Sequence, residues 1–140
     1  MKKNKILVTG VAGYIGGTFA YEVLKKGFKV YGIDSFINSN RNNVDIFFKN
    51  FPRDFNFSEI DLANDTSELK KVFDEFNPDF IVHFAGLKSV SESQEKPDLY
   101  MANNVGSTRN LLESMNSKSF FIFSSSATVY GNNPNQPLTE

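Results

Sequence analysis

Short apolar runs alternate along this chain with longer segments in which apolar residues recur every three or four positions. The runs predict five strands, at residues 5–9, 28–33, 55–60, 80–84 and 120–123. Short apolar strands that alternate with helices are typical of a parallel sheet covered by helices on both faces. The pattern therefore predicts an α/β fold, with the third strand near an edge of the sheet.

Helical spacing is clearest after the first and third strands. After the first strand, Ile15 and Phe19 lie four residues apart, and Gly27 is a typical helix stop. After the third strand, apolar residues occupy positions i, i+3, i+4 and i+7: Leu69, Val72, Phe73 and Phe76. Asp65, three residues before Glu68, predicts a capping-box-like start for the helix after the third strand.

Two further segments are expected to contain helices. Residues 35–54 predict a loop followed by a short helix, because asparagines precede apolar residues at helical spacing. Residues 98–115 predict a longer helix with apolar positions at Val105, Leu111, Leu112 and Met115. Right-handed crossovers from a central first strand then give the strand order 3-2-1-4-5, a Rossmann-like doubly wound parallel sheet.

Length and composition narrow the classes of protein. The 140 residues suit one domain, and no repeat or linker divides them. The net charge of −1 argues against a nucleic-acid partner. Cysteine is absent, which excludes disulfides and thiolate metal sites. No apolar run reaches a length of about 18 residues, so we expect no membrane span and a cytoplasmic protein.

Three glycines, Gly10, Gly13 and Gly16, follow the first strand at intervals of three and open the first helix. Glycine lets the main chain turn tightly and approach a pyrophosphate, while the helix N-terminus supplies N–H groups and a positive dipole end. Asp34 ends the second strand, where a carboxylate is placed to accept hydrogen bonds from a ribose diol. The combination predicts a dinucleotide site, in preference to a tight turn without a ligand.

Ligands of such sheets bind at the carboxyl ends of the strands. Residues 61–62 follow the third strand, residues 85–88 the fourth and residues 124–131 the fifth. These segments are expected to bring small and polar side chains to the edge that holds the glycines. Lys88 is expected to lie at this edge and to contact the ligand. The alternative is that it is an ordinary surface lysine with no ligand. His83, inside an apolar strand, is expected to be a packed core histidine.

Four segments carry a resemblance to a known family: residues 9–16, 82–88, 103–108 and 123–131. Together they resemble the UDP-glucose 4-epimerase family of the extended short-chain dehydrogenase/reductase superfamily. The glycine motif is typical of the superfamily, whereas residues 83–88 and 124–131 indicate the 4-epimerase. The resemblance implies an enzyme that binds NAD, oxidises C4 of a UDP-hexose to a ketone, and returns the hydride to the other face of the sugar.

The resemblance also implies roles for individual residues. The implied cofactor-binding residues are Gly10, Gly13, Tyr14, Ile15, Gly16, Asp34, Asn38, Ser39, Asp61, Leu62, Phe84, Ala85, Gly86, Lys88, Asn103 and Ser124. Among these, Asp34 is expected to hold the adenosine ribose and to repel a 2′-phosphate. Lys88 is expected near the nicotinamide. Ser126 matches the catalytic serine that hydrogen-bonds the sugar 4-hydroxyl. No metal is implied, the substrate is a UDP-hexose, and the family allows a homodimer.

One catalytic feature of the family is expected outside this chain. The general base of the family is the tyrosine of a Tyr-x-x-x-Lys helix beyond the fifth strand, where lysine lowers the pKa of the phenol. We expect residues 1–140 to be an NAD-binding domain that is truncated after the fifth strand and inactive alone. The alternatives are a catalytically silent NAD-binding remnant and another nucleotide-sugar enzyme such as a 4,6-dehydratase.

Overall fold

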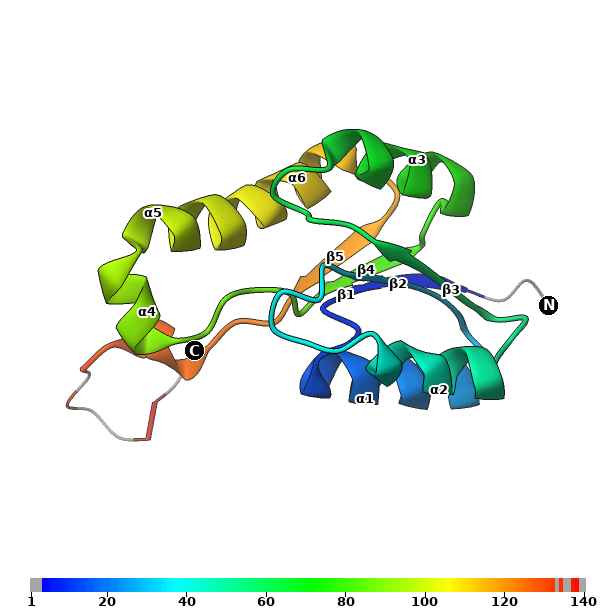
Figure 1. Ribbon diagram of the computed structural model, residues 1–140, viewed down its shortest axis with the longest axis horizontal. Helices are drawn as coiled ribbons and strands as arrows, with labels where there is room; N and C mark the ends of the chain where they lie inside the picture. The colour runs from blue at the N-terminus through cyan, green and yellow to red at the C-terminus, as the bar shows by residue number, and fades with distance from the viewer. Residues whose placement is uncertain (1–3, 133, 135–136, 139–140) are drawn as a thin grey trace.

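The computed structural model describes residues 4–132, 134 and 137–138. At its centre lies a parallel sheet in the order β3-β2-β1-β4-β5 (Figure 1). The strands are β1 (Lys5–Thr9), β2 (Lys29–Asp34), β3 (Phe55–Glu59), β4 (Phe80–His83) and β5 (Phe120–Phe123). Both the predicted strand order and the edge position of β3 are confirmed.

Helices cover both faces of this sheet. On one face lie α1 (Tyr14–Lys25) and α2 (Asn42–Asn50), and on the other lie α3 (Thr66–Phe76) and α6 (Gly106–Ser114) (Figure 1). This arrangement confirms the doubly wound fold. It also confirms the short helix predicted within residues 35–54.

Successive residues of β1 supply both apolar cores. Ile6 and Val8 pack into the core beneath α1 and α2, whereas Leu7 packs into the core beneath α3 and α6. Since side chains alternate between the faces of a strand, a strand covered on both faces is apolar at successive positions. β1 is therefore fixed from both sides, and so is the turn that follows its carboxyl end.

The predicted stop of α1 at Gly27 is confirmed. Gly27 has a φ of +86° and donates its N–H to the Leu24 carbonyl at 2.9 Å. Phe28 donates to the Val23 carbonyl at 3.1 Å, which completes a Schellman motif. The chain then enters β2 and carries Asp34 to the edge of the sheet where α1 begins.

The segment predicted as a single helix over residues 98–115 is more complex. α5 (Pro97–Tyr100) leads into a π-helical turn, Met101–Val105, and then into α6. α4 (Val90–Glu95) was not predicted from the sequence. A π-helical turn holds one extra residue, so apolar positions before and after it fall out of phase. Of the predicted apolar positions, Leu111 is buried and Met115 packs against the same core. Val105, in the π-helical turn, is 54% exposed, and Leu112 is 48% exposed.

The predicted capping box at the start of α3 is wrong. Asp65 makes no side-chain cap, and its carboxylate instead accepts the N–H of Asp61 at 2.9 Å. Glu68 accepts a hydrogen bond from Lys71 on the next turn at 2.6 Å. Both side chains of the expected box therefore have other partners, which sequence spacing alone does not reveal.

β5 forms the second edge of the sheet. Phe120 is 68% exposed, although its ring stacks on Phe80 of β4 with centroids 5.7 Å apart. A 3-10 helix, Ala127–Tyr130, follows β5. Within the part of the chain that the structure describes, no helix is both long enough and apolar enough to cross a membrane.

Candidate functional site

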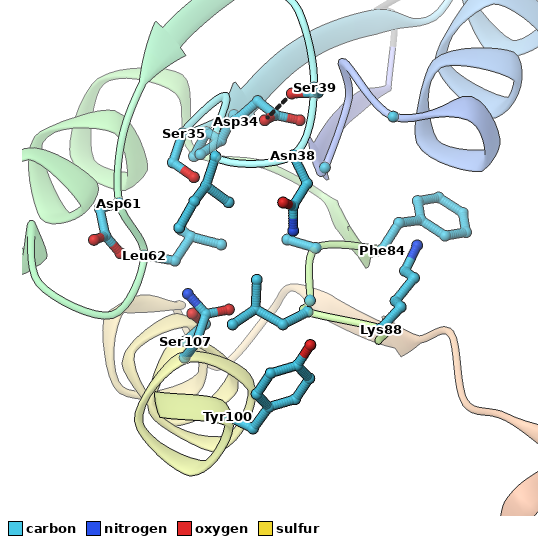
Figure 2. A pocket seen from close by; sticks show the side chains of 18 of the residues that line it. Asp34, Ser35, Asn38, Ser39, Asp61, Leu62, Phe84, Lys88, Tyr100 and Ser107 are labelled. Atoms are coloured by element: carbon cyan, nitrogen blue, oxygen red, sulfur yellow. Dashed lines mark hydrogen bonds between the residues drawn. The ribbon is translucent and has the colours of Figure 1, made fainter. Parts of the chain in front are cut away.

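A cleft of about 410 Å³ opens where the loops after β1, β2, β3 and β4 meet. Many of the predicted site residues line it: Gly10, Gly13, Tyr14, Asp34, Asn38, Ser39, Asp61, Leu62, Phe84, Ala85, Gly86, Lys88 and Asn103. Figure 2 shows side chains from these separate loops around one common space. The fold thus gathers in one place residues that are widely spaced in the sequence.

The turn between β1 and α1 leaves room only for glycine at two positions. Gly10 has a φ of +68°, and a Cβ there would lie 2.9 Å from the main-chain nitrogen of Ala85. A Cβ at Gly16 would lie 2.3 Å from the carbonyl oxygen of Gly10. Real Cβ atoms do not approach other heavy atoms so closely. These glycines therefore let β1 turn directly into α1 while the turn packs against the loop after β4.

The start of α1 presents main-chain N–H groups beside this turn. The first intrahelical hydrogen bond runs from the N–H of Gly17 to the carbonyl of Gly13, at 2.9 Å. The N–H groups of residues 14–16 precede it and form the positive end of the helix dipole. Tyr14 is 90% exposed, so its side chain leaves the helix end open. The arrangement suits a bound anion such as a phosphate group.

Asp34 organises the loop next to the glycine turn. Its Oδ1 accepts the hydroxyl of Ser39 at 2.8 Å (Figure 2) and the N–H of Phe36 at 2.9 Å. Its Oδ2 accepts the N–H of Ala12 at 3.0 Å. Two lone pairs per oxygen leave Oδ2 able to accept one more hydrogen bond. This carboxylate is held next to the start of α1, which suits a phosphate group. In that place it is suited to accept hydrogen bonds from a ribose diol and to repel a further phosphate on the ribose.

The loop after β3 forms the far wall of the cleft. Asp61 accepts the N–H of Ala63 at 2.9 Å and the side-chain amide of Asn64 at 2.8 Å. Asn110 of α6 donates to the Leu62 carbonyl at 2.8 Å. These bonds tie residues 61–64 to α6 and hold the Leu62 side chain at the apolar part of the wall (Figure 2).

The loop after β4 forms the opposite end of the cleft. The Phe84 ring lies against Phe19 of α1, with centroids 5.5 Å apart. Lys88 is exposed and lines the cleft together with Phe84 (Figure 2). A flexible cation therefore stands at this end, whereas the Asp34 carboxylate stands at the other.

His83 lies beneath this loop and outside the lining of the cleft. It is 2% exposed, with Nδ1 2.7 Å from the Thr9 hydroxyl and Nε2 3.0 Å from the Thr108 hydroxyl. Burial lowers the pKa of His83 from 6.5 to about 4, so the ring is neutral at pH 7. The prediction of a packed core histidine is confirmed.

Four predicted site residues do not line the cleft. Ile15 and Gly16 lie on the first turn of α1, and neither is part of the lining of the cleft. Ser124 follows β5 and donates its N–H to the His83 carbonyl at 3.2 Å. Ser126 is exposed, and its hydroxyl oxygen accepts the hydroxyl of Thr128 at 3.0 Å. The two serines thus share the carboxyl edge of the sheet without lining the cleft.

Leu87 lines the cleft as part of residues 85–88, which were expected at this edge. Sequence reasoning missed several other residues of the lining: Ile33, Ser35, Ile37, Ile60, Ser89, Glu92, Tyr100 and Ser107. Glu92 accepts the Tyr100 hydroxyl at 3.0 Å, and this hydrogen bond lowers the pKa of Glu92. The pattern Ser89-x-x-Glu92 was an available signal, because Ser89 does cap α4 by accepting the Glu92 N–H at 3.3 Å. Among the described residues, no cluster of three or more His, Cys, Asp or Glu side chains is placed to bind a metal.

Known proteins match this chain over nearly its whole length. A family model described as GDP-mannose 4,6 dehydratase matches residues 7–140. UDP-glucose 4-epimerase 2 of Oryza sativa is 44% identical over 96% of this chain, which spans 34% of that relative. The UDP-glucose 4-epimerase of Yersinia enterocolitica is 46% identical, and this chain spans 40% of it. A relative of the same name from Klebsiella pneumoniae is 38% identical and is 99% covered.

Solved structures lead to the same family. UDP-glucose 4-epimerase from Bifidobacterium longum, in complex with NAD⁺ and UDP, superposes with a TM-score of 0.90 at 39% identity. That match covers 98% of this chain and 41% of the other. The enzyme from Stenotrophomonas maltophila, with bound NAD and formylated UDP-arabinopyranose, gives 0.86 at 34% identity, covering 98% and 41%. The chain therefore belongs to the UDP-glucose 4-epimerase family, within the broader family that the GDP-mannose 4,6 dehydratase model describes.

Proposed function

We propose that residues 1–140 form the NAD-binding domain of a UDP-glucose 4-epimerase, which interconverts UDP-glucose and UDP-galactose by transient oxidation at C4. The observation that carries the proposal is the cleft in which the glycine turn, the start of α1 and Asp34 meet. The chain spans about two fifths of several full relatives, so the activity is proposed for the whole protein.

The residues of the cleft fit NAD in shape and charge. The main-chain N–H groups of residues 14–16 would hold the pyrophosphate, since Gly10 and Gly16 let the turn pack closely enough for α1 to begin beside the cleft. Asp34 would accept the adenosine ribose diol through the remaining lone pair of Oδ2. Asn38, Ser39, Asp61 and Leu62 would surround the adenosine end. When bound, NAD supplies the acceptor and the donor of the C4 hydride.

The opposite end of the cleft suits the nicotinamide. Phe84, Ala85 and Gly86 offer an apolar and main-chain wall, and Lys88 and Asn103 add polar groups to the same space. Ser124 and Ser126 follow β5 at the same edge of the sheet. We assign Ser126 to the sugar 4-hydroxyl, where its own hydroxyl would donate or accept one hydrogen bond. The tyrosine base would come from a part of the protein beyond β5.

The proposal includes the setting of the enzyme. We place it in the cytoplasm and in galactose metabolism, with a UDP-hexose as substrate and neither nucleic acid nor membrane as partner. The net charge of −1 argues against a nucleic-acid partner, and the absence of cysteine fits a cytoplasmic protein, because disulfides are rare in that compartment. A homodimer is the proposed assembly, supported by Val105 and Leu112, which are both about half exposed and lie seven residues apart.

A cofactor-selectivity experiment tests the proposal. Asp34→Ala should weaken NAD binding much more than NADP binding, because the carboxylate attracts a ribose diol and repels a 2′-phosphate. Asp34→Asn is the matched control, since it keeps the size of the side chain and removes only the charge. An equal loss of affinity for NAD and for NADP would contradict the assignment of Asp34 to the ribose.

Two other functions stay open to test. A nucleotide-sugar 4,6-dehydratase is favoured by the description of the family model that matches residues 7–140. A full-length protein that converts its substrate to a 4-keto-6-deoxy sugar, with no 4-epimer formed, would establish that alternative. A folded chain that binds NAD but belongs to no active full-length protein would be a silent cofactor-binding remnant.

A further inference from the structure

The loop after β4 is held by side chains that lie outside the cleft. Ala85, Gly86 and Leu87 line the cleft with little side-chain bulk at positions 85 and 86. Their main-chain positions therefore define this wall. The N–H of Ala85 donates to the Thr9 hydroxyl at 3.2 Å, and the N–H of Leu87 donates to Oδ1 of Asn104 at 2.8 Å. His83 contacts Thr9 directly and reaches Asn104 through the Thr108 hydroxyl.

The Thr108 hydroxyl fixes one end of this connection. It donates its single hydrogen to the carbonyl of Asn104, one helical turn earlier, at 2.8 Å. Toward Nε2 of His83, 3.0 Å away, the Thr108 oxygen is therefore an acceptor. Nε2 must then carry the imidazole proton, and Nδ1 must accept.

The Thr9 hydroxyl gives the same answer independently. Thr9 is fully buried, its oxygen accepts the N–H of Ala85, and its other contact is Nδ1 of His83 at 2.7 Å. A proton on Nδ1 would leave the Thr9 hydroxyl hydrogen without an acceptor among the described residues, and burying an unpaired donor is costly. With Nδ1 as the acceptor, every hydrogen in this series of hydrogen bonds has an acceptor.

Asn104 completes the connection to the loop. Its side-chain amide accepts the N–H of Leu87 and returns a hydrogen bond to the Leu87 carbonyl at 3.0 Å. A Cβ at Gly86 would lie 3.3 Å from Oδ1 of Asn104, which is tighter than an ordinary contact. Asn104 belongs to the π-helical turn, as does its neighbour Asn103, which lines the cleft. Within this turn Asn103 lines the cleft, and the next residue, Asn104, hydrogen-bonds the main chain of Leu87.

We propose that His83 is a positioning residue which, as the Nε2–H tautomer, links Thr9 and Thr108 and thereby fixes the main chain of Ala85 and Leu87 at the wall of the cleft. The hydrogen bonds run in one direction from the N–H of Ala85 through Thr9, His83 and Thr108 to the carbonyl of Asn104. A hydrogen-bonded chain of this kind is directional, so it sets position more narrowly than apolar packing does. Only its link to cofactor geometry rests on the proposed function.

The first test needs no substitution. His83 is the single histidine of the chain, so nitrogen NMR of the histidine-labelled protein reports this ring without ambiguity. The proposal requires a neutral ring at pH 7 with the proton on Nε2. A proton on Nδ1 would overturn it.

The second test measures amide hydrogen exchange in Thr108→Val, which removes the acceptor of Nε2–H at nearly constant volume. Thr18→Val is the matched control, because Thr18 donates to the Tyr14 carbonyl at 2.7 Å with the same helical spacing but touches no histidine. In Thr108→Val, exchange at Ala85 and Leu87 should rise by about tenfold relative to the Val82 amide, the size expected from one lost hydrogen bond. Thr18→Val should leave that ratio unchanged.

The outcomes separate this proposal from the proposed function. Equal acceleration at Ala85, Leu87 and Val82 in Thr108→Val would show a general loss of stability and overturn the positioning role. Both readouts are taken without cofactor. If both readouts gave the expected results but the protein bound no NAD, the proposed function would be refuted and the role of His83 would stand.

Discussion

Replacing Gly16 with alanine probes the packing of the turn on which the cofactor site depends. Gly16 lies in the first turn of α1, and Gly106 is the first residue of α6, with helical torsion angles of φ −60° and ψ −46°. A Cβ at Gly16 would lie 2.3 Å from the Gly10 carbonyl oxygen, whereas a Cβ at Gly106 would have no neighbour within 4 Å. The two substitutions are therefore chemically identical and differ only in what the new methyl group meets.

The expected effects have opposite signs. Gly106→Ala should raise the free energy of unfolding by about 0.5–1 kcal/mol, because alanine loses less entropy than glycine in a helix. In Gly16→Ala the main chain must move by about 1 Å to relieve the clash, and such overpacking costs on the order of 1–3 kcal/mol. For a chain of this size, 1 kcal/mol corresponds to roughly 4 °C in Tm.

Calorimetry or thermal circular dichroism on both variants supplies the readout. Gly16→Ala should melt below the unsubstituted chain, and Gly106→Ala should melt at or above it. The displaced Gly10 carbonyl should also weaken NAD binding in Gly16→Ala, with Gly106→Ala unaffected. If Gly16→Ala were as stable as Gly106→Ala, the close packing of the glycine turn described above would be refuted.

Three further predictions follow from the site and its surroundings. Asp34→Ala should raise the Kd for NAD by roughly 30-fold, about 2 kcal/mol for a charged hydrogen bond, and titration calorimetry with NADP should show a much smaller loss. Because the pKa of His83 falls from 6.5 to about 4 on folding, its contribution to stability is present above pH 6.5 and is lost as the pH falls toward 4. Denaturant melts should show this loss, up to about 3 kcal/mol, and His83→Gln should abolish its share; identical pH profiles for the two proteins would contradict the assignment. The 140 residues alone should not epimerise UDP-galactose in a coupled assay, and any turnover above the background would show that the tyrosine base is not required.

The features predicted correctly from the sequence are those set by local patterns. Glycines that must turn a strand into a helix, and apolar runs that must be buried on both faces, leave a recognisable spacing. Asp34 was predicted to lie near the glycines because neighbouring parallel strands end at the same edge. Its three loop hydrogen bonds confirm a fixed carboxylate in that place.

The features that were not predicted depend on contacts between distant segments. Residues 90–95 carry little apolar periodicity, so α4 left only the capping pattern Ser89-x-x-Glu92 as a signal. In the π-helical turn, Asn104 accepts a hydrogen bond from the N–H of Leu87, which lies seventeen positions away in the chain. A single sequence does not show that these two residues are partners. For the same reason, proton positions around His83 follow only from the assembled structure.

The measurement that tests the central claim most directly is a titration of the nitrogen-labelled chain with NAD, followed by two-dimensional NMR. We expect saturable binding of one NAD per chain, with the largest chemical-shift changes at the amides of residues 10–16, 34–39 and 84–88. Absence of binding by a folded chain, or saturable changes confined to other surfaces, would contradict the assignment of this cleft to the cofactor.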